Sequence, residues 1–358
     1  MSMRIRLGSM ATALALLVPL VANAETIAVV APSSGPYAAL GNQILVGARA
    51  AAEATGHEVL ALDEPCEAEA DTNTVTRMRE AGAVAAVGFL CTETLSRLMP
   101  ELAEAGIPAI TVAVRSDLLM EDALRHNWPL FRMAPGEQAE AEAISAAVLD
   151  RWKAEPVAII DDGTIYGREL ASAVRGALEQ GGINPVFIDT YRPGQEQQVA
   201  LVRRLAKAGA THVVVGGDRN DVSVIARDAG TERIPLTILA GDTMRAANRP
   251  VPLKDGVLAA ALPDYAGLPA AADVAATLRA GHGEPEGYTL PAYAAVQIVA
   301  ASLSQDDDTP LAARLLDSDF QTVIGPLAFD ARQELVPNPL RLQEWRGGGF
   351  HILAPPTQ

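Results

Sequence analysis

Residues 26–32 read Thr-Ile-Ala-Val-Val-Ala-Pro, and a helical pattern with an apolar face follows at Gly41–Ala54. An apolar run without polar alternation is typical of a strand that is buried on both faces of a parallel sheet. The same unit recurs along the next part of the chain, with strand-like runs at His57–Asp63, Val84–Phe89 and Pro108–Ala113 and helical patterns at Asp71–Ala81 and Leu95–Ala105. This alternation predicts a doubly wound α/β lobe.

The pattern then restarts and predicts a second lobe of similar build. Strand-like runs are found at Pro129–Pro135, Pro156–Asp161, Pro185–Tyr191, Thr211–Gly217 and Pro235–Gly241, and helical patterns lie between them. Two later helical patterns, Ala271–Ala280 and Pro291–Ser304, are expected to complete the first lobe, which is otherwise thin on one side. We therefore predict an α/β protein of two Rossmann-like lobes, residues 25–134 plus 263–337 and residues 135–262 plus 338–358.

Length and charge agree with two lobes and exclude one class of partner. The chain has 358 residues, of which 49% are hydrophobic, so it is long enough to bury two cores. It carries 44 acidic and 28 basic residues, a formal net charge of −16. Such a surface repels a phosphate backbone, so we expect no nucleic acid partner.

The N-terminus has the pattern of a secretory signal. Arg4 and Arg6 precede an apolar run from Met10 to Ala22, and Ala22-Asn23-Ala24 offers small residues for cleavage. This predicts a signal peptide at residues 1–24 that is cleaved near Ala24. A membrane anchor is the alternative, but the run is short and contains Pro19 and Asn23. We expect an exported protein that is not embedded in the membrane once the signal is removed.

Cys66 and Cys91 are the only two cysteines of the chain. Export places them in an oxidising compartment, where a disulfide is the natural interpretation. Closing a loop of 25 residues would stabilise the fold by about 3–4 kcal/mol. A metal pair or a catalytic thiol are the alternatives, although no histidine stands at ligand spacing from either cysteine.

Signatures of catalysis are missing from the sequence. It contains no phosphate-binding loop, no GxGxxG after a strand, no GxSxG and no HExxH. The acids Asp161 and Asp162 are adjacent on a strand end, so their side chains point to opposite faces and are expected to be loop acids. We expect a protein that is not an enzyme and that has no cofactor and no metal site.

A binding function therefore directs attention to the carboxyl ends of the strands, where open α/β sheets hold their ligands. The polar candidates that follow strands are Ser34, Tyr37, Thr92, Arg115, Tyr166, Asp218 and Asp242. A helix start at Thr92 could hold a carboxylate, Arg115 could clamp one, and the two aspartates could receive an ammonium. The alternatives are that Thr92 is only an N-cap, that Arg115 is only exposed, and that the aspartates are turn acids.

The chain resembles the periplasmic Leu/Ile/Val-binding proteins of ABC importers over residues 25–350. The resemblance rests on the order and spacing of short segments: Ile27–Val30, Ser34-Gly35-Pro36, Cys66 and Cys91, Asp161-Asp162 with Tyr166-Gly167, Gly216-Gly217, Tyr293–Gln297, and Gly325-Pro326-Leu327 with Asp330. It implies the type I periplasmic binding protein fold, with a ligand cleft between lobes joined near Ala134–Glu137, Leu262–Asp264 and Val336–Leu340. It also implies a Cys66–Cys91 disulfide.

The resemblance further implies roles for individual residues. Thr92 corresponds to a hydroxyl residue that binds the carboxylate of an amino acid, and the backbone of Ala113 would bind its ammonium or carboxylate. Asp242 takes the place of the acid that pairs with the ammonium. Tyr166 would close over the ligand, and Tyr288 would line the side-chain pocket.

Three positions depart from the family pattern. Arg115 replaces a small hydroxyl residue, Asp218 replaces an aromatic residue, and Leu40 replaces a tyrosine near the cleft mouth. Plain leucine offers no partner for an added cation and an added anion. The expected ligand is a more polar amino acid or a small acid whose carboxylate Arg115 can bind. The alternative is that Arg115 and Asp218 bridge the lobes when the cleft closes.

These patterns predict the solute-binding component of an ABC importer. It would work in the periplasm as a monomer, capture an amino acid or similar small carboxylate, and deliver it to an inner-membrane permease. A periplasmic receptor module that senses such a ligand without transport is the alternative, because both need the same closing cleft.

Overall fold

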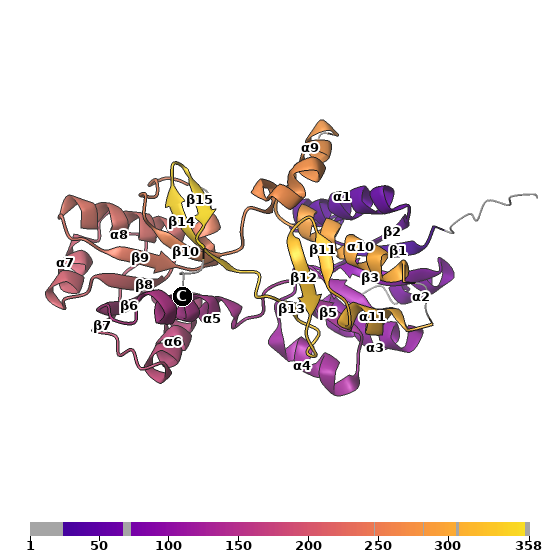
Figure 1. Ribbon diagram of the computed structural model, residues 1–358, viewed down its shortest axis with the longest axis horizontal. Helices are drawn as coiled ribbons and strands as arrows, with labels where there is room; N and C mark the ends of the chain where they lie inside the picture. Colours follow the sequence, from indigo (N-terminus) through magenta and orange to yellow (C-terminus); the bar gives the residue numbers. More distant parts are fainter. Residues whose placement is uncertain (1–23, 67–72, 247, 282, 306–307, 355–358) are drawn as a thin grey trace, which may run out of the picture.

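The computed structural model describes residues 24–66, 73–246, 248–281, 283–305 and 308–354. The signal peptide expected at residues 1–24 lies outside the described residues except for Ala24. Two α/β lobes stand side by side and are joined by extended segments (Figure 1). This confirms the predicted fold class.

The first lobe is built on a parallel sheet in the order β2-β1-β3-β4-β5. Its strands are β1 (Thr26–Ala31), β2 (Glu58–Asp63), β3 (Ala83–Gly88), β4 (Ala109–Thr111) and β5 (Leu130–Arg132). β5 lies in the run Pro129–Pro135, which the strand pattern assigned to the second lobe; that assignment is wrong, because β5 pairs with β4 and closes the first sheet. Its helices are α1 (Ala38–Thr55), α2 (Thr74–Glu80), α3 (Thr92–Ala105), α4 (Asp117–His126), α9 (Ala272–Ala280), α10 (Thr289–Leu303) and α11 (Leu311–Leu316). A small antiparallel sheet of β11 (Phe320–Thr322), β12 (Gly325–Phe329) and β13 (Leu335–Val336) completes the lobe.

The second lobe repeats the strand order and extends it with a hairpin. Its sheet runs β7-β6-β8-β9-β10-β14-β15, and only β14 and β15 are antiparallel to their neighbours. The strands are β6 (Val157–Asp161), β7 (Phe187–Thr190), β8 (His212–Gly216), β9 (Thr237–Ala240), β10 (Leu258–Ala261), β14 (Arg341–Arg346) and β15 (Gly349–Ile352). The helices are α5 (Ala139–Arg151), α6 (Ile165–Gln180), α7 (Val199–Lys207) and α8 (Arg219–Thr231), with the short turn η1 (Asp242–Arg245).

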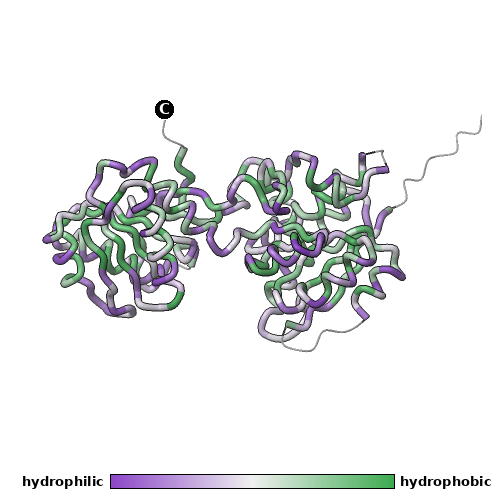
Figure 2. The backbone as a smooth tube through the Cα atoms, turned by 90° about the horizontal axis from the view of Figure 1, so that it is seen from below, coloured by the Kyte–Doolittle hydropathy of each residue, from purple (hydrophilic) through white to green (hydrophobic). Residues whose placement is uncertain are grey.

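Each sheet is covered by helices on both faces, which explains the continuous apolar runs of the strands. In β1, Ile27 and Val29 pack with α1 and α10, whereas Ala28 and Val30 pack with α2, α3 and α4. Figure 2 shows the hydrophobic segments running through the interior of both lobes. α1 and α10 approach closely because residue 47 is a glycine, since a Cβ there would overlap the backbone of Thr289.

Three segments cross between the lobes, as the fold class predicts. They connect β5 to α5, β10 to the short turn η2 (Tyr265–Gly267), and β13 to β14. They pass through the narrow region between the lobes (Figure 1). Among the described residues, no helix has both the length and the apolar character needed to span a membrane.

Candidate functional site

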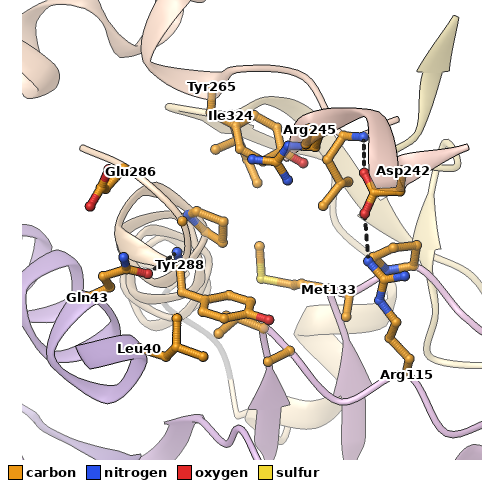
Figure 3. Close-up of a pocket in the computed structure, with 17 residues that line it drawn as sticks. Leu40, Gln43, Arg115, Met133, Asp242, Arg245, Tyr265, Glu286, Tyr288 and Ile324 are labelled. Atoms are coloured by element: carbon orange, nitrogen blue, oxygen red, sulfur yellow. Dashed lines mark hydrogen bonds and ion pairs between the residues drawn. The ribbon is translucent and has the colours of Figure 1, made fainter. Parts of the chain in front are cut away.

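A pocket of about 410 Å³ lies where the two lobes face each other (Figure 3). This volume falls in the range of pockets that hold small ligands. The first lobe and the crossing segments provide an apolar wall, and charged side chains come from both lobes. The residues that line it are Leu40, Gln43, Val112, Ala113, Arg115, Met133, Ala134, Pro135, Asp242, Arg245, Leu262, Tyr265, Glu286, Gly287, Tyr288, Pro291 and Ile324.

Arg115 belongs to the first lobe and reaches across to the second. It follows β4, and its backbone carbonyl accepts a hydrogen bond of 2.6 Å from the buried guanidinium of Arg132. Arg132 in turn forms ion pairs of 2.8 Å with Asp117 and Glu334. Because the backbone is held in this way, the Arg115 side chain projects into the pocket, where its Nη2 lies 3.2 Å from Oδ2 of Asp242.

Asp242 begins η1, immediately after β9 in the second lobe. Its Oδ1 accepts a hydrogen bond of 3.0 Å from the backbone N–H of Leu262, which lies on a crossing segment. Its Oδ2 receives Arg115, so both carboxylate oxygens have protein donors. This ion pair links the two lobes. Arg115 therefore bridges the lobes in this structure, but its partner is Asp242 and not Asp218.

A buried glutamate that sequence reasoning missed holds Asp242 in place. Oε1 of Glu140, on α5, accepts both the backbone N–H of Asp242 at 2.6 Å and the hydroxyl of Tyr166 at 2.7 Å. Burial raises the pKa of Glu140 above its ordinary value, and the hydrogen bond from Tyr166 opposes part of that rise. Residue 241 is a glycine because any Cβ there would overlap this carboxylate.

Tyr166 does not line the main pocket. Its hydroxyl is turned to Glu140, and burial followed by the nearby carboxylate raises its pKa above the ordinary range. It lines an adjoining hollow of about 280 Å³ together with Arg115 and Glu137. The expected tyrosine is therefore beside the ion pair, with its hydroxyl already bonded to the protein.

Two predicted residues form part of the pocket wall. Tyr288 extends into the pocket between Leu40 and Met133 (Figure 3), and its backbone N–H donates to Oε1 of Gln43 at 3.2 Å. Burial raises the pKa of Tyr288. The Ala113 backbone also lines the pocket, but its N–H donates to the Thr111 hydroxyl at 3.3 Å.

Besides Gln43, three polar residues of the pocket were not predicted. Arg245, at the end of η1, makes no ion pair or hydrogen bond through its side chain with any described residue. Tyr265 lines the same pocket, and burial raises its pKa to about 12. Glu286 is exposed at the far side of Tyr288 (Figure 3). Arg245 lies only three residues beyond Asp242, so inspecting the whole turn after β9 would have found it.

Besides Tyr166, four predicted ligand residues do not line this pocket. Ser34 and Tyr37 are exposed before α1, and Asp218 caps α8 by accepting the Asn220 N–H at 2.7 Å, so the turn-acid alternative for Asp218 describes what it does here. Thr92 is the first residue of α3 and is not its N-cap, a position that Cys91 occupies. Contact of these four residues with a ligand stays a prediction for the closed arrangement of the lobes.

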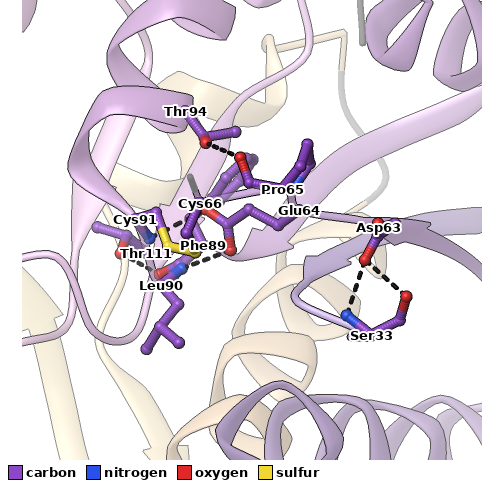
Figure 4. The surroundings of a disulfide bond; sticks show 10 residues. All are labelled: Ser33, Asp63, Glu64, Pro65, Cys66, Phe89, Leu90, Cys91, Thr94 and Thr111. Atoms are coloured by element: carbon purple, nitrogen blue, oxygen red, sulfur yellow. Dashed lines mark hydrogen bonds between the residues drawn. A yellow bond between two sulfur atoms is a disulfide. The ribbon is translucent and has the colours of Figure 1, made fainter. Parts of the chain in front are cut away.

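Cys66 and Cys91 form the expected disulfide, with their Cα atoms 5.5 Å apart (Figure 4). The buried Glu64 lies beside it and accepts the backbone N–H groups of Leu90 at 2.8 Å and Cys91 at 3.0 Å, one on each oxygen. Burial raises the pKa of Glu64 to about 7. The two sulfurs are bonded to each other, so this cluster offers no thiolate to a metal.

Comparison with known proteins agrees with the architecture. The periplasmic binding protein family model matches residues 25–349. The Leu/Ile/Val-binding protein homolog 3 of Brucella melitensis biotype 1 is 28% identical over 340 residues, covering 90% of this chain and 92% of that protein. The Leu/Ile/Val-binding protein of Escherichia coli strain K12 is 26% identical over 347 residues, covering 90% and 91%.

The fold is also found in solved structures. An ABC transporter substrate-binding protein from Desulfitobacterium hafniense in complex with Leu superposes with a TM-score of 0.65. The identity is 21%, and the match covers 92% of this chain and 99% of that one. Because the family model spans nearly the whole chain after the N-terminal segment, this protein belongs to the periplasmic binding protein family.

Proposed function

We propose that this protein is the exported solute-binding component of an ABC importer, and that it captures a small carboxylate solute such as an amino acid. The observation that carries the proposal is the pocket between the lobes, whose apolar wall faces the charged groups Arg115, Asp242 and Arg245. A solute with an apolar body and a polar end fits this lining. The Leu/Ile/Val-binding relatives support the same class of ligand.

The two lobes act as the moving bodies in this proposal. Residues 25–134 plus 263–337 form one body and residues 135–262 plus 338–358 form the other. Hinge motion in the three crossing segments brings them together on the solute. Thr92 and Ala113 then meet the solute from the first lobe, and Tyr166 closes over it from the second.

Export and delivery complete the proposed role. The signal peptide is removed near Ala24, the mature monomer works in the periplasm, and its closed form is recognised by an inner-membrane permease. In this role the protein binds the solute and releases it without changing it chemically. Mass spectrometry of a solute eluted from the protein tests that point and is expected to recover it intact.

The test of the function is a thermal-shift screen of the mature protein after copurified solutes have been removed by unfolding and refolding. A solute at 100 times its dissociation constant adds about 2.7 kcal/mol of stability. We expect one class of small carboxylates to raise the melting temperature, and Arg115→Ala to weaken that shift. Arg125→Ala is the matched control, since Arg125 is exposed and pairs with Asp122 on its own helix.

The proposal predicts saturable stabilisation by members of a single chemical class. If no amino acid and no small carboxylate stabilises the refolded protein at millimolar concentration, the proposed function is wrong. A thermal shift that survives unchanged in Arg115→Ala and in Asp242→Ala would place the solute outside this pocket.

A further inference from the structure

The charged residues of the pocket indicate which class of small carboxylate it binds. This inference rests on the proposed function. An amino acid needs an acceptor for its ammonium group, because an ammonium that leaves water without a partner is strongly disfavoured. Asp242 is a carboxylate of the pocket wall, and its side chain is 19% exposed. Its surroundings therefore decide whether an ammonium can be accepted.

Each oxygen of Asp242 already accepts one hydrogen bond from the protein. Leu262 N–H donates to Oδ1 at 3.0 Å, and the Arg115 guanidinium donates to Oδ2 at 3.2 Å. Arg115 thus already pairs with the carboxylate that the ammonium of a ligand would need. An incoming ammonium would meet the positive charge of Arg115 as well as a carboxylate that is already neutralised.

Donors for an anion remain available in the same place. The Arg115 guanidinium uses one nitrogen on Asp242, and its other donors are open to the pocket, since its side chain is 42% exposed. The Arg245 side chain has no partner among the described residues and lines the same pocket. These two guanidinium groups suit a carboxylate, which arginine binds in a planar, bidentate manner.

The remaining acid of the pocket does not serve an α-amino acid. Glu286 is exposed and lies on the opposite side of Tyr288 from the Arg115–Asp242 pair (Figure 3). The ammonium of an α-amino acid sits on the carbon next to its carboxylate. If the carboxylate binds at the arginines, the ammonium is therefore held beside them and away from Glu286.

We propose that the cleft selects small carboxylic acids that have an apolar body and no α-ammonium group, with Arg115 acting as the specificity-determining residue. Arg115 occupies the ammonium position on Asp242, and its free donors together with Arg245 hold the carboxylate. The apolar body lies against Leu40, Met133 and Ile324.

Calorimetric titration with matched pairs of solutes tests this proposal. The pairs are 4-methylpentanoate with leucine and 3-phenylpropanoate with phenylalanine, which differ only in the α-amino group. For the refolded wild-type protein we expect the acid without the amine to bind about tenfold to 100-fold more tightly in at least one pair, the effect of one unpaired polar group.

Variants sharpen the test. Arg115→Thr removes the cation and frees Oδ2 of Asp242, so we expect the preference to fall by at least about tenfold or to reverse toward the amino acid. Arg245→Gln should weaken binding of the acid. The preference of this variant for the acid over the matched amino acid should stay close to that of the wild-type protein. Arg125→Thr serves as the surface control, and melting curves establish that each variant is folded.

The outcomes separate the two proposals. If wild-type protein binds leucine or phenylalanine more tightly than the matched acid, the inference about Arg115 is overturned while the proposed function stands. If the acids are preferred but Arg115→Thr keeps the full preference, Arg115 is not its source, and the inference fails. If neither member of either pair nor any solute of the thermal-shift screen binds, the proposed function itself fails, and the inference falls with it.

Discussion

Glu64 in the first lobe and Glu140 in the second are both buried glutamates that organise backbone at the end of a strand, but they do so differently. Glu64 uses both oxygens, one for each of two neighbouring backbone N–H groups. Glu140 uses a single oxygen for Asp242 N–H and the Tyr166 hydroxyl. Glu64 therefore supports the disulfide region, whereas Glu140 supports the charged end of the pocket.

The difference teaches that the two lobes contribute unequally to the site. The disulfide and Glu64 are not among the residues that line the pocket, and they hold the segment between β3 and α3. Glu140 fixes Asp242 directly, and Asp242 pairs with Arg115. We expect changes near Glu64 to alter stability alone, and changes at Glu140 to alter both stability and solute binding.

The disulfide should have the largest effect on stability. Replacing both Cys66 and Cys91 by serine opens a loop of 25 residues, so we expect the free energy of unfolding to fall by about 3–4 kcal/mol. Urea denaturation measures this loss. Solute affinity should stay within a few-fold of the wild-type value. A large loss of affinity in a variant that is still folded would contradict the claim that the disulfide region does not affect the pocket.

Glu64 should make stability depend on pH. Its pKa is raised from 4.5 to about 7, so the folded protein keeps a proton that the unfolded chain releases in this range. Its contribution is fully present below pH 4.5 and is lost as pH rises through 7, a change on the order of 3 kcal/mol.

The measurement is urea denaturation of wild type and Glu64→Gln between pH 4.5 and 8. The difference in unfolding free energy between the two proteins should shift in favour of the variant as pH rises. Glu93→Gln, on an exposed position of α3, is the control. A difference that stays constant over this range would show that Glu64 does not titrate there.

Two variants of Glu140 distinguish the effect of its hydrogen bonds from the effect of its charge. Glu140→Ala leaves Asp242 N–H and the Tyr166 hydroxyl without their acceptor, and we expect a loss of about 2 kcal/mol in stability and about tenfold in solute affinity. Glu140→Gln can keep both bonds through its one carbonyl oxygen and should bind nearly as wild type does. Equal losses in the two variants would mean that the charge of Glu140, and not its geometry, holds the site.

Tyr166 should give the smallest effect. Tyr166→Phe removes one hydrogen bond to Glu140, and we expect a loss of about 1 kcal/mol in the free energy of unfolding. Tyr37→Phe is the matched control, because Tyr37 is exposed and its hydroxyl has no partner among the described residues. A loss as large as that of Glu140→Ala would show that Tyr166 does more than bond to Glu140.

Much of the fold could be predicted from the sequence because buried parallel strands appear in it as continuous apolar runs. The Ile, Val and Ala runs of β1, β3, β6 and β8 have no polar alternation, and each is covered on both faces. The strand ends also led to Arg115 and Asp242, which the structure brings together. Their separation of 127 residues hid the fact that they bind each other.

The buried glutamates could not be predicted for a related reason. Glu140 is one of several acids in the segment 137–142, and nothing in that pattern shows which of them is turned inward. Its partner Asp242 lies 102 residues further on. Asp218 shows a related ambiguity, because a strand-end aspartate that caps the next helix has the same local pattern as one that faces a ligand.

The central claim is that a solute binds between the lobes and draws them together. Small-angle X-ray scattering of the refolded mature protein, with and without a saturating solute identified by thermal shift, tests it most directly. The account predicts a smaller radius of gyration with solute, and no such change in Arg115→Ala at a concentration where that variant stays unbound. An unchanged radius of gyration at demonstrated saturation of the wild-type protein would contradict it.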